Sequence, residues 1–120
     1  MYELEKVPDS NVLLVTAKGE ITGDDYEDVL IPAIESTLET YDKVRILVHL
    51  GAEYDGFEGE AMWDDTKVGL SHFTSFEKCA IVSDVKWIRR SIKAFGFLIP
   101  GEVQLFPNEE LATATDWVKQ

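Results

Sequence analysis

The chain has 120 residues, a formal net charge of −12 and no apolar stretch of the roughly 18 residues that a membrane-spanning helix needs. A length in this range predicts a single domain, residues 1–120, with one core. Because binding to nucleic acid requires Lys and Arg to neutralise phosphates, the acidic balance argues against a nucleic-acid partner. The N-terminus shows no secretion signal and Cys79 has no disulfide partner, so we expect a cytoplasmic protein.

The charge is unevenly distributed along the chain. Residues 1–65 have a net charge of −13, whereas residues 66–120 have a net charge of +1. An anionic partner would therefore be attracted only to the second half.

The first half is expected to begin with a hairpin of strands at residues 2–7 and 12–17, joined by turn residues. Thr22 is then a candidate N-cap, and Asp25 three residues later would complete a loose capping box. Apolar residues recur at helical spacing from 26 to 41, which predicts a helix. Pro32 lies inside it and should bend it.

The middle of the chain predicts a central strand, Val44–Leu50, covered on both faces and ended by Gly51. Residues 51–59 predict a loop at the carboxyl end of this strand, where α/β sheets usually place binding sites. A helix is expected to follow at residues 58–71.

The last third predicts two more strands, Cys79–Val82 and Val103–Phe106, each followed by a helix. Ser83 or Asp84 is expected to cap the first helix, which Gly96 should end. Pro107 and Asn108 are expected to stop the last strand and cap the second helix, at residues 109–118. Because strands separated by helices need crossover connections, we expect a mostly parallel sheet of four or five strands, an N-terminal antiparallel hairpin and about four flanking helices.

The order and spacing of these segments resemble the SpoIIAA-like branch of the STAS fold, which is related more distantly to the CRAL-TRIO domain. The resemblance implies a small bacterial α/β protein and, for most members of the family, no established biochemical activity. It also spans nearly the whole chain. The matching segments are Pro32-Ala33-Ile34, Val44-Arg45-Ile46-Leu47, Gly56-Phe57-Glu58-Gly59, Phe76 to Asp84 followed by Trp87, Val103-Gln104-Leu105-Phe106, and Ala112 to Trp117.

The chain departs from the resemblance at one functional point. Anti-anti-sigma relatives are switched by phosphorylation of a Ser or Thr at the start of the helix after the third strand, but residues 51–60 contain neither. The phosphoswitch is therefore not implied here. Glu53, Asp55 and Glu58 make this loop permanently acidic, either as a phosphate-like binding surface or as an ordinary solvated loop.

The sequence carries little that predicts catalysis. It has no nucleophile elbow, no phosphate-binding Gly-rich loop, no zinc-protease motif and no pair of cysteines. We expect no catalytic residues, no metal site and no cofactor, and we interpret Cys79 as a small buried apolar residue. The alternative is a small hydrolase-like enzyme that uses His49, Asp55 and His72.

The most suggestive segment for binding is residues 86–100. Lys86, Arg89, Arg90 and Lys93 recur at helical spacing and form a basic stripe that could contact an anion. Such a stripe beside apolar residues could hold an amphiphile or touch a membrane surface peripherally. The alternative is an ordinary solvated helix face, with the apolar residues forming core or homodimer contacts. The candidate ligand-binding or partner-binding residues are Tyr54, Phe57, Trp87, Arg90, Phe95, Phe97, Leu98 and Ile99.

Together these features predict a non-enzymatic STAS-like binding or regulatory module. We expect the chain to form a homodimer, and its partner would be another protein or an apolar or amphiphilic, lipid-like small molecule. A third hypothesis is a purely structural homo-oligomer in which residues 95–99 form the contact.

Overall fold

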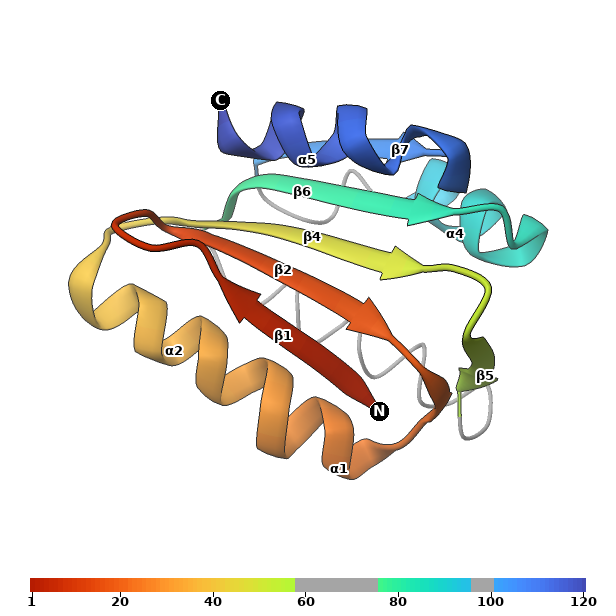
Figure 1. The fold of residues 1–120 in the computed structure, drawn as a ribbon, viewed down its shortest axis with the longest axis horizontal. Coiled ribbons are helices and arrows are strands. Elements are labelled where there is room, and N and C mark those ends of the chain that lie inside the picture. The colour runs from red at the N-terminus through yellow and green to blue at the C-terminus, as the bar shows by residue number, and fades with distance from the viewer. Residues whose placement is uncertain (58–75, 96–100) are drawn as a thin grey trace.

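A five-stranded mixed sheet forms the centre of the protein (Figure 1). The computed structural model describes residues 1–57, 76–95 and 101–120. The strands lie in the order β1-β2-β4-β6-β7. β1 pairs with β2 in antiparallel fashion and the other neighbours are parallel, which confirms the predicted fold class. The strands are β1 (Tyr2–Lys6), β2 (Val12–Ala17), β4 (Val44–Leu50), β6 (Phe76–Ser83) and β7 (Glu102–Phe106).

A second, two-stranded sheet was not predicted. β3 (Gly19–Ile21) pairs in parallel with β5 (Tyr54–Phe57), and the backbone N–H of Gly19 donates to the carbonyl of Glu53 at 2.6 Å. The prediction of a loop throughout residues 51–59 was therefore wrong for residues 54–57. This pairing joins segments more than 30 residues apart in the chain, so no local pattern indicates it.

The first helical segment confirms the predicted capping box. The Thr22 hydroxyl accepts the Asp25 N–H at 3.3 Å, while the Asp25 carboxylate accepts the Thr22 N–H at 2.9 Å. This is the reciprocal pattern of a capping box. Pro32 lies in the first turn of the following helix, where proline is tolerated, and a π-helical segment directly precedes that helix; the bend expected at Pro32 stays a prediction. The segment runs through α1 (Gly23–Asp25), π-helix η1 (Tyr26–Leu30) and α2 (Ile31–Thr40).

The two later helices follow β6 and β7. The N–H of Val85 donates to the Ser83 hydroxyl at 3.1 Å, so Ser83 supports the start of α4 (Lys86–Phe95). Asp84 instead accepts the backbone N–H of Asn108 at 3.1 Å. A 3₁₀ turn, η3 (Asn108–Glu110), leads into α5 (Leu111–Lys119), and neither has a side-chain cap, so the predicted capping by Asn108 was wrong. The helix predicted at 58–71 and the helix end at Gly96 lie outside the described residues.

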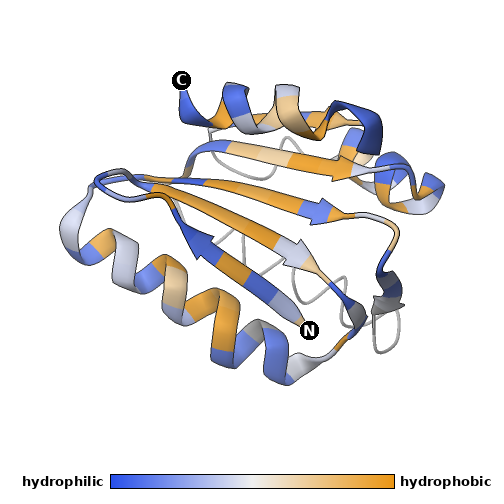
Figure 2. Ribbon diagram, viewed as in Figure 1, coloured by the Kyte–Doolittle hydropathy of each residue, from blue (hydrophilic) through white to orange (hydrophobic). Residues whose placement is uncertain are grey.

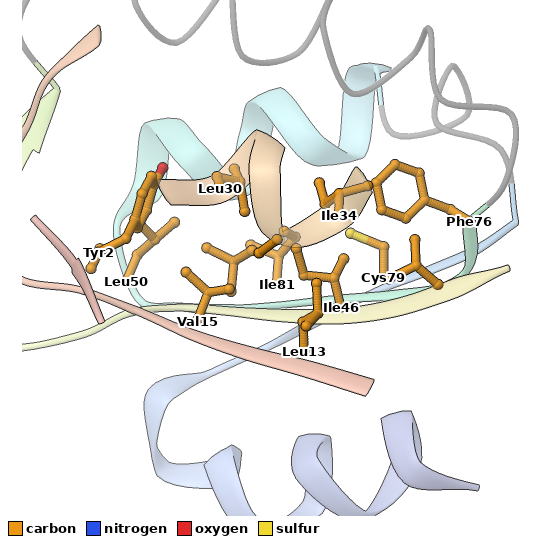
Figure 3. Packing of buried hydrophobic residues seen from close by; sticks show 14 of the residues in the cluster. Tyr2, Leu13, Val15, Leu30, Ile34, Ile46, Leu50, Phe76, Cys79 and Ile81 are labelled. Atoms are coloured by element: carbon orange, nitrogen blue, oxygen red, sulfur yellow. The ribbon is translucent and has the colours of Figure 1, made fainter. Parts of the chain in front are cut away.

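Helices cover both faces of the sheet. The main core lies on the face shared by α2 and α4, and a second cluster lies under α5 on the opposite face (Figure 3). β4 is central and largely buried, as predicted, and Figure 2 shows hydrophobic residues along the inner strands. None of the described helices has both the length and the apolar character needed to cross a membrane.

Candidate functional site

The carboxyl ends of the parallel strands lie together at one end of the sheet. β5 and the start of α4 both lie at this end, because they follow β4 and β6 closely in the chain (Figure 1). This is the position at which open α/β sheets usually bind ligands. Two of the predicted binding elements, the 51–57 segment and α4, are therefore placed at the same end of the fold.

The basic stripe predicted on α4 faces away from the core. Ile88 and Ile92 are buried, with relative exposures of 0% and 7%, and anchor the inner side of the helix. On the outer side, Trp87 is 42% exposed. We define the α4 outer face as Lys86, Trp87, Arg90 and Lys93, all of which are exposed.

Most other described cations contact groups of the protein itself. Lys18 bridges Glu3 at 3.0 Å and Glu53 at 3.5 Å, Arg45 pairs with Glu77, and the Lys78 ammonium lies 4.9 Å from the Trp117 ring centroid. Within residues 1–57, 76–95 and 101–120, no ion pair involves the three cations of the α4 outer face. No described acidic residue pairs with these three cations, so none of the described carboxylates competes with a partner for them.

Arg89 has a different environment from the rest of the stripe. It is half-buried, and its guanidinium donates to the Ser83 carbonyl at 2.9 Å. The contact ties α4 to the carboxyl end of β6. Part of the hydrogen-bonding capacity of Arg89 is therefore used within the fold.

The structure describes only some of the aromatic and apolar residues that were predicted to bind a ligand. Tyr54 is half-buried against the main core, and burial raises the pKa of its hydroxyl to about 12. Phe57 ends β5 opposite Ile21, and Phe95 is the last residue of α4, but their side chains are outside the description. Phe97, Leu98 and Ile99 also lie outside the described residues.

The residues of the hydrolase hypothesis do not form a site among those described. His49 lies on β4 with its ring close to Gly51, where an added Cβ would be 2.5 Å from Nε2. Burial lowers its pKa, and no described carboxylate forms an ion pair or hydrogen bond with the ring. Asp55 is exposed, and His72 is outside the described residues.

Two further predictions concern cysteine and metal. Cys79 is 1% exposed, and burial raises its thiol pKa to about 12, so it is a structural core residue as expected. Among the residues that the structure describes, no three or more His, Cys, Asp or Glu side chains are grouped so that they could hold a metal ion.

One surface feature was missed by the sequence analysis. A groove of about 320 Å³ lies at the β1–β2 edge of the sheet and is lined by Glu3, Leu4, Glu5, Leu14 and Thr16. It forms because α5 packs mainly against β4 and β6, further along the sheet. No pattern within β1 or β2 indicates where that helix will lie.

Comparison with known proteins identifies the family. The family model described as SpoIIAA-like matches residues 12–119. The chain belongs to the SpoIIAA-like family. The expected resemblance is thereby confirmed, and the segments that carried it lie within the match.

A solved structure supports the same assignment of this SpoIIAA-like chain. It is an uncharacterized protein from the DUF3478 family with a SpoIIAA-like fold, from Shewanella loihica PV-4. The two chains are 30% identical and superpose with a TM-score of 0.70, over 98% of this chain and 92% of the other. No curated protein matches the chain.

Proposed function

We propose that this SpoIIAA-like protein is a non-enzymatic binding module that recognises an anionic amphiphile through the α4 outer face. The observation that carries the proposal is the combination of an exposed tryptophan with three cations on one side of one helix. Tryptophan suits a boundary between water and hydrocarbon, because its ring is apolar and its N–H is polar. Neighbouring Lys and Arg side chains suit the anionic headgroup.

The charge distribution of the whole chain supports an oriented contact. With a net charge of −12, most of the protein surface repels an anionic ligand or lipid surface. The α4 outer face concentrates three of the 11 Lys and Arg residues within eight positions. Attraction at this face and repulsion elsewhere would orient the protein so that α4 contacts the anionic ligand or surface first.

Binding agrees better with the geometry than hydrolysis does. The described residues supply no carboxylate partner for His49, whereas the residues of the α4 outer face are exposed. A protein partner of matching chemistry, or a second copy of the chain, is the competing occupant. The experiment below distinguishes these occupants from an amphiphile.

The test compares binding to vesicles of phosphatidylcholine alone and of phosphatidylcholine mixed with phosphatidylglycerol, at low salt. Lys86→Gln/Arg90→Gln/Lys93→Gln removes the three cations, and Lys6→Gln/Lys43→Gln/Lys119→Gln removes three exposed cations elsewhere. The two variants have equal net charge. Sedimentation with the vesicles measures the bound fraction.

The wild type is expected to bind only the mixed vesicles. The α4 variant should lose affinity by at least roughly tenfold, because each basic residue near an anionic surface contributes to binding. The control variant should stay within about threefold of the wild type. Equal loss in both variants, or absence of wild-type binding, would refute the proposal. If α4 instead forms a dimer contact, the wild type would have the mass of a dimer and would not bind vesicles, and the α4 variant would have the mass of a monomer. This result would also refute the proposal.

A further inference from the structure

β1 is the outermost strand of the five-stranded sheet in the part of the chain that the structure describes. It pairs with β2 alone among the described strands. At its two ends, the N–H of Lys18 donates to the carbonyl of Met1 at 2.7 Å, and the N–H of Val7 donates to the carbonyl of Val12 at 3.1 Å. In an antiparallel ladder such bonds recur at every second residue. The odd-numbered residues of β1 therefore bond to β2, and Leu4 and Lys6 direct their backbone groups away from β2.

The side chains of the odd-numbered residues give this edge its charge. Leu4 packs against the main core beneath α2, so Glu3 and Glu5 lie on the opposite face of the sheet. There they line the 320 Å³ groove together with Leu14 and Thr16. The edge thus combines outward backbone donors and acceptors with two carboxylates and a recess beside them. Of the two, Glu3 also bridges Lys18 at 3.0 Å, whereas no described cation forms an ion pair with Glu5.

Pairing of β1 with β1 of a second copy is opposed by this charge. A twofold axis makes the two strands antiparallel, and outward-facing residues must pair with outward-facing residues. Each register that joins three or more residues of β1 then places Glu3 opposite Glu3, Glu3 opposite Glu5, or Glu5 opposite Glu5. Like charges directly across a strand pair are destabilising.

We propose that β1 accepts an added strand from a protein partner, an extended segment with Lys or Arg at every second position. The partner backbone would bond to Leu4 and Lys6, and its cations would face Glu3 and Glu5 along the groove. Strand addition of this kind takes affinity from main-chain bonds and specificity from alternate side chains. The surface is distinct from the α4 outer face and of opposite charge, so the inference does not depend on the proposed function.

The test uses a synthetic peptide of seven alternating Val and Lys residues. Two controls are an alternating Val and Glu peptide and a Val and Lys peptide N-methylated at every second amide. The readout is hydrogen exchange of individual backbone amides by NMR. The Val and Lys peptide is expected to slow exchange at Leu4 and Lys6 by at least about tenfold, while Glu3 and Glu5, which bond to β2, change little.

Variants separate backbone pairing from general attraction. Lys6→Pro removes an outward N–H without removing a bond to β2, and proline is tolerated at such edge positions. It should weaken peptide binding by at least about tenfold. Should that variant fold poorly, Glu3→Gln/Glu5→Gln, which leaves the backbone unchanged, should also weaken binding and should abolish the preference for Lys over Glu.

Three results would overturn the inference. The first is unchanged exchange at Leu4 and Lys6 when the peptide is bound. The second is equal binding of the N-methylated peptide, which would indicate charge attraction alone. The third is protection of the same amides in the absence of peptide together with a doubled mass in solution, which would make a second copy the occupant.

Discussion

Substitution of Gly101 by alanine is predicted to destabilise the protein strongly. Gly101 precedes β7 and has a backbone φ of +92°, a value that residues other than glycine rarely adopt. An added Cβ would lie 2.3 Å from the carbonyl oxygen of Phe76 and 2.9 Å from its carbonyl carbon. These are backbone atoms of β6, so they cannot move aside as a flexible side chain can.

Two costs combine at this position. Holding alanine at an unfavourable φ costs about 1–3 kcal/mol, and overpacking against a fixed neighbour costs about 1–3 kcal/mol more. The expected loss in the free energy of unfolding is therefore about 2–6 kcal/mol, a large share of the roughly 5–15 kcal/mol typical of a domain.

Gly19→Ala is the matched control. Gly19 has φ of +63°, but an added Cβ there would meet no atom within 4 Å, so only the backbone cost of about 1–2 kcal/mol remains. Urea unfolding of both variants, followed by circular dichroism, measures the difference. If Gly101→Ala lost no more stability than Gly19→Ala, the close approach of the two strands at Phe76 would be refuted.

Three further predictions concern local chemistry. Because burial raises the Cys79 pKa to about 12, the native thiol should react with Ellman's reagent at pH 8 only as fast as the protein unfolds; rapid labelling would contradict its burial. Burial lowers the pKa of His49, so the unfolded state takes up a proton first as the pH falls through about 6.5 and stability falls. In the His49→Gln variant, the free energy of unfolding measured by urea titration should therefore fall less between about pH 7 and pH 5. An unchanged pH dependence would argue against a lowered His49 pKa. Thr22→Ala removes one side of the capping box with Asp25 and should cost about 1 kcal/mol, measured by thermal unfolding; no loss would show that the cap is dispensable.

Elements defined by local signals were predictable from the sequence. The Thr22 and Asp25 pair predicted the helix start. β6 begins at Phe76, three residues before the predicted start at Cys79. The strand also includes the charged residues Glu77 and Lys78, which contact Arg45 and Trp117, and these contacts depend on segments far away in the chain.

Features that depend on distant segments were not predictable. β3 and β5 are short, contain glycine and form only because their segments meet across the fold. The same reason explains why the groove at the β1–β2 edge was missed, since its open side depends on where α5 packs.

In the candidate site, too, some features follow from local sequence and others depend on the surrounding fold. The spacing of Lys86, Arg90 and Lys93 was enough to predict an outward basic stripe, because helical geometry alone places these side chains on one side. The contact of Arg89 with the Ser83 carbonyl depends on the turn between β6 and α4, which the spacing does not specify.

The central claim, that the α4 outer face meets an anionic amphiphile, is tested most directly by the fluorescence of Trp87. In a Trp63→Phe/Trp117→Phe variant, Trp87 is the sole tryptophan of the chain. Vesicles containing phosphatidylglycerol are predicted to shift its emission to shorter wavelength, and lipids brominated near the headgroup should quench it. Emission that stays at the solvent-exposed wavelength, with no quenching, while the protein remains folded would contradict the account.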